Sequence, residues 1–149
     1  GLTGCDLATK ELAQRNLRGQ PPTPLISGVA ELRYTENRDV GFGLLRVIPA
    51  KVRRPLILGL GFCVLGLLGT LWWTQRRRLR RFEAIGFAVL LAGALGNLAD
   101  RLFRGYVVDF MHVRYWPIFN VADVLLGVGV GLLLLGYLRP AKGSEPSPG

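Results

Sequence analysis

The stretch PLILGLGFCVLGLLGTLWW, residues 55–73, decides the fold class of this chain. It contains no charged residue, and its length is close to the roughly 20 apolar residues that a helix needs to cross a bilayer. It ends in Trp72 and Trp73, and tryptophan is enriched where a membrane helix meets the lipid headgroups. The stretch therefore predicts a membrane-spanning helix over residues 55–74.

Two further apolar runs follow this stretch. The first is short, but neighbours such as Phe82 extend it to spanning length, so we predict a helix over 82–99. The second predicts a helix over 118–138 and is apolar except for Asn120 and Asp123. The sequence therefore predicts a mainly α-helical membrane protein, in which a bundle of spanning helices forms a single domain.

The composition argues against a soluble, nucleic-acid-binding or metal-binding protein. Half of the residues are hydrophobic although the net charge is +9, and the arginines flank apolar runs without an aromatic-basic module. We therefore predict no nucleic-acid partner. Cys5 and Cys63 lack metal-ligand spacing and His112 is the only histidine, so we predict neither a metal centre nor a cofactor. His112 is more typical of an interfacial hydrogen-bonding residue than of a catalyst.

The orientation in the membrane follows from the loop QRRRLRR, residues 75–81, which carries five arginines between the first two spans. Short loops this basic stay in the cytoplasm. Residues 1–54 and the loop 101–117 are then extracytoplasmic. The tail 140–149 is cytoplasmic, and its Pro, Gly and Ser content predicts disorder.

Three basic residues run weakly against this orientation. Lys51, Arg53 and Arg54 lie beside the first span on its outer side. The five arginines of the short loop outweigh them.

The predicted outer position of residues 1–54 requires a segment that carries them across the membrane. They contain no spanning run, so we expect that a first spanning helix precedes Gly1 and is missing from this chain. Residues 2–5, LTGC, would be its last residues. The same letters resemble a lipoprotein-processing signal, which we interpret as a chance match at this position.

The outer region is expected to hold a short helix and a small sheet. Residues 6–18 predict an amphipathic helix, and the alternation of apolar and charged residues over 30–34 predicts a strand with one covered face. Residues 41–45 are its predicted partner. The leucines of the helix are Leu7, Leu12 and Leu17. We therefore expect a small extracytoplasmic β-sheet platform, making 1–54 a β-rich region.

Polar residues gather at one end of the predicted spans. Asn97, Asp100 and Arg101 have spacings of three and four, which place them on one helical face. Asn120 and Asp123 share a face at the outer end of the last span. Ionisable groups in or beside spanning helices are costly and usually functional.

Asp109 is a further acid that lies near Asp123 in the sequence. Asp109, in the segment VVDF, is predicted on the outer loop between the last two spans, where it can approach Asp123. Two carboxylates in one partly apolar site cannot both ionise cheaply, so one stays protonated near neutral pH. The ionised aspartate can then activate water while its partner stabilises the oxyanion. The pair predicts an aspartyl peptidase that needs no metal.

Three of these polar residues also have a purely structural interpretation. Asp100 can form an ion pair with Arg101 or Arg104 at a helix end, which we favour for this residue. Asp123 suits the first turn of a helix because of the macrodipole, and Asn120 suits an N-cap. The shared location of these residues is what favours function.

Small residues predict close helix packing. Gly127 and Gly131 have GxxxG spacing on the last span, and Ala92 and Gly96 have the same spacing on the preceding one.

Four ordered segments resemble those of the bacterial lipoprotein signal peptidases, the signal peptidase II family. The likeness covers residues 6–138. The matching segments are DLATK (6–10), GALGNLADR (93–101), VVDF (107–110) and FNVAD (119–123). The resemblance implies an inner-membrane enzyme with four spanning helices. It would cleave diacylglyceryl-modified prolipoproteins just before the lipidated cysteine.

The resemblance also implies roles for individual residues. Asp109 and Asp123 would be the catalytic pair. The residues that position the pair or contact substrate would be Asp6, Lys10, Asn37, Asn97, Arg101 and Asn120. It further implies contact with membrane lipid and binding of a globomycin-type inhibitor.

One segment departs from the family pattern. Asn37 and Phe42 keep their spacing, but Asp39 and Val40 replace smaller residues. The substrate contact at Asn37 is therefore in question, and a paralog that binds lipopeptide without cutting it is an alternative. A proton-conducting transporter fragment is a further alternative. It is disfavoured because the polar groups do not cross the membrane.

Overall fold

The computed structural model describes residues 1–39 and 47–138. Four helices and three strands lie in this part of the chain. Their bounds are α1 Leu2–Leu17, β1 Thr23–Ile26, β2 Ala30–Asn37, α2 Ala50–Gln75, α3 Arg81–Phe103, β3 Val107–Val113 and α4 Val121–Leu138. The strand predicted at 41–45 and the tail 140–149 lie outside the described residues.

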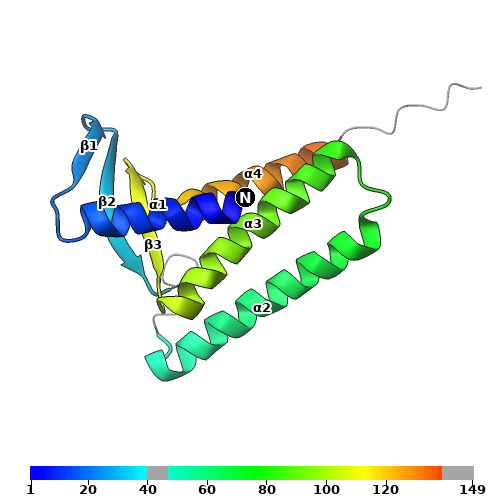
Figure 1. Ribbon diagram of the computed structural model, residues 1–149, viewed down its shortest axis with the longest axis horizontal. Coiled ribbons are helices and arrows are strands. Elements are labelled where there is room, and N and C mark those ends of the chain that lie inside the picture. The colour runs from blue at the N-terminus through cyan, green and yellow to red at the C-terminus, as the bar shows by residue number, and fades with distance from the viewer. Residues whose placement is uncertain (40–46, 139–149) are drawn as a thin grey trace, which may run out of the picture.

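Three of the helices are long and apolar enough to cross a membrane, namely α2, α3 and α4. The predicted mainly α-helical membrane fold is therefore confirmed. In Figure 1, α3 and α4 lie side by side, and α2 runs along α3. Helix α2 buries only Ile57 among its residues, and its other apolar side chains are exposed or half-buried, as expected for a helix with one side toward lipid.

Helices α3 and α4 approach closely because glycines remove side chains from their contact. A Cβ atom on Gly93 would lie 2.6 Å from the carbonyl oxygen of Ala122, and one on Gly129 would lie 2.8 Å from the backbone nitrogen of Leu90. The predicted packing face at Gly127 and Gly131 is wrong, because a Cβ at either position meets open space. The contact uses the glycine between them, since the opposite side of α4 faces away from α3.

This packing predicts the effect of one added methyl group. Gly93→Ala should lower the free energy of unfolding by about 1–3 kcal/mol, because the helix backbones must move apart. Thermal unfolding in detergent micelles measures the change. Gly127→Ala is the matched control, since it adds the same methyl group to α4 in open space. Equal stability of the two variants would contradict the close-contact interpretation.

The three strands form one antiparallel sheet with β2 in the centre. Thr35 of β2 pairs with Asp109, so Asp109 lies within β3 and the predicted loop position is wrong. The sequence pattern did not predict this strand. Its first four residues, 107–110, are all buried, so apolar and polar residues do not alternate along it.

Helix α1 packs against α3 and the sheet. Its first turn contains residues 2–5, and the helix continues without a break to Leu17. Of the three leucines of the predicted amphipathic helix, Leu17 packs against the core, whereas Leu12 is 57% exposed. The buried face carries Asp6, Lys10 and Ala13, spaced by four and three residues. Ala13 packs with Val108 and Phe110 in the core beside the sheet.

Candidate active site

Asp109 projects from β3 and is 3% exposed. Its Oδ2 atom accepts a hydrogen bond of 2.9 Å from Nδ2 of Asn37, at the end of β2. Its Oδ1 atom accepts one of 2.6 Å from Nδ2 of Asn120. Both carboxylate oxygens are thus held by neutral amides, which orient the group without supplying a counter-charge.

Asp123 lies in the first turn of α4. Its Oδ1 atom accepts a hydrogen bond of 2.9 Å from Nδ2 of Asn97, on α3. Its Oδ2 atom accepts one of 3.2 Å from the backbone N–H of Asn120, whose Oδ1 accepts from the backbone N–H of Asp123 at 3.1 Å. This reciprocal pair is a capping box, which satisfies two N–H groups at the start of the helix.

Asn120 connects the two aspartates. Its side chain is fully buried, and its Nδ2 donates to Asp109 and, at 3.3 Å, to Oδ1 of Asn97. The same residue caps α4 through Asp123. The N-cap interpretation of Asn120 is therefore confirmed, and the same side chain contacts Asp109. One amide side chain fixes a strand carboxylate and a helix carboxylate in the same place.

A buried ionic cluster around Lys10 contacts the side chain of Asn97. Nζ of Lys10 lies 3.1 Å from Oδ1 of Asn97, 2.8 Å from Oδ2 of Asp6 and 3.1 Å from Oδ2 of Asp100. The side chains of Lys10, Asp6 and Asp100 are all 0% exposed. Because a charge in such surroundings must be paired, the cluster fixes the Lys10 ammonium and, through it, the orientation of the Asn97 amide.

The two carboxylates of this cluster also hold neighbouring elements. Oδ1 of Asp6 accepts a hydrogen bond of 2.8 Å from the backbone N–H of Ala122 in the first turn of α4. A Cβ atom on Gly96 would collide with the Asp6 carboxylate, so the glycine is what admits this side chain. Asp100 pairs with Arg104 and accepts a hydrogen bond from the backbone N–H of Val108. The predicted ion pair of Asp100 is confirmed.

Arg101 borders the site without bonding to either aspartate. It donates to the backbone carbonyls of Asn97, at 3.1 Å, and of Asp39, at 3.2 Å. The backbone N–H of Asp39 in turn donates to Oδ1 of Asn37 at 3.0 Å. Any residue at position 39 supplies these backbone groups, so the departure from the family pattern leaves the Asn37 contact with Asp109 intact.

Burial raises the pKa of Asp109 from its ordinary value to about 6. The hydrogen bonds from Asn37 and Asn120 favour the charged form and oppose this shift, whereas the nearby charge of Asp123 adds to it. The neutral carboxyl of Asp109 therefore persists to higher pH than that of an exposed aspartate.

A cavity of about 320 Å³ opens beside Asp123. Its polar end carries Asn37, Asp39, Asn97, Arg101 and Asp123, and its walls are apolar side chains from α2, α3 and α4. The wall residues are Ile57, Leu60, Gly61, Val64, Ala94, Leu98 and Leu126. A substrate with an apolar part and a polar backbone matches both ends of this cavity.

The family model of signal peptidase (SPase) II matches residues 1–139. The chain belongs to the signal peptidase II family. It is a peptidase and therefore a hydrolase, and it is embedded in the membrane by several spans.

Within residues 1–39 and 47–138, no cluster of three or more His, Cys, Asp or Glu side chains is placed to hold a metal ion.

Bacterial relatives match most of this peptidase. The lipoprotein signal peptidase of Solibacter usitatus is 36% identical over 92% of this chain and 85% of its own length. That of Aquifex aeolicus is 37% identical over 91% of this chain and 81% of its own. The fold is also that of a solved bacterial membrane enzyme with a TM-score of 0.79 and 23% identity, over 99% of this chain and 88% of that one.

The structure brings together all eight residues that the sequence singled out for the site of this peptidase. They are Asp6, Lys10, Asn37, Asn97, Arg101, Asn120, Asp109 and Asp123. Sequence reasoning missed the contact of Asp100 with Lys10, and predicted for Asp100 only an ion pair with Arg101 or Arg104 at a helix end. His112 does not join the site and forms a cross-strand pair with Glu31 at 3.0 Å.

Proposed function

We propose that this peptidase removes the signal peptide from diacylglyceryl-modified prolipoproteins, with Asp109 and Asp123 as its catalytic carboxylates. The observation that carries the proposal is that Asn120 binds both carboxylates, of which Asp123 lines the polar end of an apolar cavity. The lipoprotein signal peptidases among its relatives support the substrate class. The bond cut is the one just before the lipidated cysteine.

The two aspartates divide the acid and base roles. Asp109, whose pKa burial raises to about 6, holds the proton. Asp123 takes a proton from a water molecule, whose oxygen attacks the scissile carbonyl carbon. The carbonyl oxygen becomes negative and accepts a hydrogen bond from the Asp109 carboxyl. Asp123 then gives the proton that it took from water to the leaving amine as the carbon–nitrogen bond breaks, and the carbonyl forms again.

The remaining site residues position this pair. Asn37 and Asn120 aim the Asp109 carboxyl, while Asn97 aims that of Asp123. The Lys10 cluster prevents rotation of Asn97, since its amide oxygen is already bonded to the ammonium. Such fixed donors need not reorganise when charge develops in the transition state.

The apolar walls of the cavity receive the lipid-modified end of the substrate. Leucine, isoleucine and valine side chains line the walls, so acyl chains and apolar signal-peptide residues fit there without losing hydrogen bonds. A globomycin-type inhibitor would occupy the same cavity. Membrane lipid contacts the outer face of α2, which is exposed along most of its length.

The proposed location is the bacterial inner membrane, with the site at the extracytoplasmic face. Two features support this orientation. The loop between α2 and α3 carries the arginines of residues 75–81, which favour the cytoplasm. Figure 1 shows that this loop lies at the opposite end of the helices from the sheet.

A cleavage assay with matched substrates tests the function. The enzyme in detergent micelles should cut a diacylglyceryl-modified prolipoprotein and leave the unmodified form intact, as resolved by gel electrophoresis. Equal cleavage of both forms would show that the lipid is not recognised. Tight binding of the modified form without cleavage would instead support the alternative of a binding paralog.

The hydrogen bond from Asn37 predicts a pH effect. Asn37→Ala removes a donor that favours charged Asp109, so the pKa of Asp109 should rise above about 6. Since protonated Asp109 is the active form, the alkaline limb of kcat/KM should move to higher pH. Thr35→Val is the matched control, because Thr35 lies opposite Asp109 on β2 and donates no hydrogen bond to it. A shift to lower pH in Asn37→Ala would refute the assignment.

A further inference from the structure

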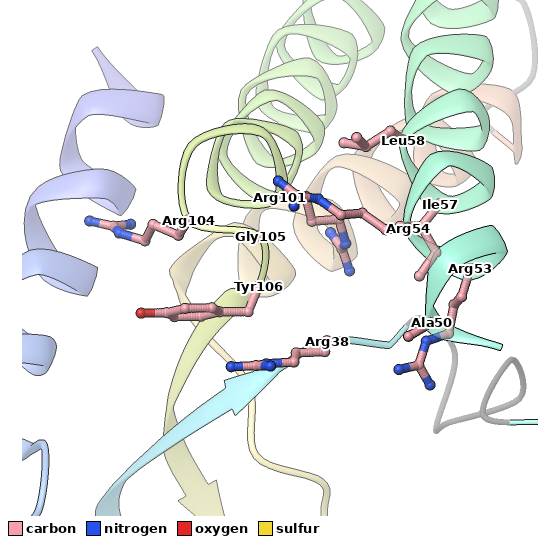
Figure 2. A pocket seen from close by; sticks show the side chains of 10 residues that line it. All are labelled: Arg38, Ala50, Arg53, Arg54, Ile57, Leu58, Arg101, Arg104, Gly105 and Tyr106. Carbon is pink, nitrogen blue, oxygen red and sulfur yellow. The ribbon is translucent and has the colours of Figure 1, made fainter.

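A second cavity lies beside the catalytic one and is basic. It measures about 280 Å³ and is bounded by the start of α2, the end of α3 and the turn into β3. Five arginines line it, as Figure 2 shows. They are Arg38, Arg53, Arg54, Arg101 and Arg104. Among the described residues, no aspartate or glutamate lines this cavity.

Three of the arginines have carboxylate partners. Arg104 pairs with Asp100 and Glu11 and extends toward α1 in Figure 2. Arg38 pairs with Glu36 at 3.1 Å, and Arg53 pairs with Asp39 at 2.9 Å. These ion pairs neutralise part of the basic lining.

The other two arginines lack such partners. Among the described residues, Arg101 donates its hydrogen bonds to backbone carbonyls, and the carboxylates of Asp100, Asp109 and Asp123 act on its charge without direct contact. Arg54 is exposed and has no hydrogen bond or ion pair with any residue in the described ranges, and its guanidinium lies over Gly105. Figure 2 shows Arg54 extending from α2 toward the end of α3, where Arg101 lies. An anion that enters the cavity can therefore contact both guanidinium groups without displacing a carboxylate from either.

The position of the cavity indicates the source of the anion. Arg53 and Arg54 immediately precede Pro55, where the apolar run of α2 begins, so they lie where a spanning helix meets the lipid headgroups. Ile57 and Leu58 continue the lining on the side of the apolar run. The cavity is therefore cationic at headgroup level and apolar next to it, which matches the phosphate and the glycerol-acyl region of a phospholipid.

We propose that this cavity binds the phosphate of an anionic phospholipid, with Arg54 and Arg101 as its principal donors. A guanidinium presents paired N–H groups that match two phosphate oxygens, and such charge-assisted bonds are short and strong. The site also explains why Arg53 and Arg54 lie at the end of the helices that the positive-inside rule disfavours. Arg101 lines both cavities, so the bound lipid lies next to the catalytic site.

Lipid retention by the intact chain tests this inference independently of cleavage. The purified protein is exchanged into micelles that contain equal amounts of phosphatidylglycerol and phosphatidylcholine, and native mass spectrometry counts the lipids retained. Wild type should retain phosphatidylglycerol preferentially. Arg54→Gln should lower this retention about tenfold, the effect of losing one charge-assisted hydrogen bond.

Lys51→Gln is the matched control. Lys51 is exposed at the same end of α2, carries the same charge and does not line the cavity. It should retain phosphatidylglycerol as wild type does, and thermal unfolding of both variants verifies that they are folded. Equal retention by Arg54→Gln and wild type, or an equal loss in Lys51→Gln, would overturn the proposal.

Competitors separate the sources of the anion. Diacylglycerol lacks the phosphate, and inorganic phosphate lacks the acyl chains, so neither should displace phosphatidylglycerol at matched concentration. Displacement by diacylglycerol would show that the arginines are not the binding groups. Displacement by inorganic phosphate would identify a free-phosphate site, and preferential displacement by a short acidic peptide would identify a polypeptide partner. Each of these results rejects a lipid site.

Discussion

Asp123→Asn is expected to lower kcat for prolipoprotein cleavage by about 10³- to 10⁴-fold, the contribution of a positioned general base. Asparagine has the shape of aspartate and keeps one of the two acceptor bonds of Asp123, which come from Asn97 and from the backbone N–H of Asn120. Asp123 is only half-buried, so water can satisfy the group that loses its partner, and the fold is retained. It cannot take a proton from water. Gel electrophoresis of a diacylglyceryl prolipoprotein measures the loss, and thermal unfolding verifies that the variant is folded.

Asp109→Asn should abolish cleavage as well, but at a cost in stability. Both oxygens of Asp109 accept hydrogen bonds from amide nitrogens, of Asn37 and Asn120. An asparagine at this position turns one of these acceptors into a donor, which leaves a buried donor unpaired and costs about 1–3 kcal/mol. The unfolding temperature should therefore fall in this variant more than in Asp123→Asn.

Glu31→Gln serves as the control for both substitutions. Glu31 is a carboxylate of the same sheet, pairs with His112 and lies outside the catalytic cavity. This variant should cleave at the wild-type rate. Full cleavage by either aspartate variant, in a preparation free of other signal peptidases, would remove that residue from the mechanism.

Lys10→Met should give the largest loss of stability, about 3–5 kcal/mol, the cost of removing one partner from a buried ion pair. Methionine fills a similar volume but leaves the carboxylates of Asp6 and Asp100 without their shared ammonium. Asn97 also loses the donor that fixes its amide oxygen. Thermal or chemical unfolding in micelles measures the loss.

A second substitution distinguishes the charge effect from lost packing. Adding Asp6→Asn to Lys10→Met removes one of the two buried carboxylate charges that the ammonium had neutralised, and should recover part of the stability. Arg15→Met is the matched single control, because Arg15 forms an i,i+4 pair with Glu11 on the same helix but is 71% exposed. It should have little effect. Equal stability of Lys10→Met and Arg15→Met would show that the cluster is not needed for the fold.

The sequence predicted the membrane helices well because hydropathy is a local property. A run without charge, such as residues 55–73, must avoid water wherever the rest of the chain lies, and a helix satisfies its own backbone in lipid. The same reasoning made Asn97, Asp109 and Asp123 conspicuous, since polar groups beside spans are rarely accidental.

The faces and partners of the elements could not be predicted in this way. Leucine spacing in α1 indicated an apolar buried face, but Asp6 and Lys10 are buried instead. The reason is that they find opposite charges and a backbone N–H on other helices, which no local pattern reveals. Gly129 rather than Gly127 or Gly131 meets α3 for a similar reason, since the rotation of α4 depends on its neighbour.

The sequence by itself thus determined the membrane class, the spans and which polar residues to suspect, because burial in lipid selects residue types one helix at a time. Only the tertiary structure decided that Asp109 lies on a strand, that Asn120 joins it to Asp123, and that five arginines surround a second cavity. Each of these facts depends on groups far apart in the chain, and only long-range packing sets the distances between them.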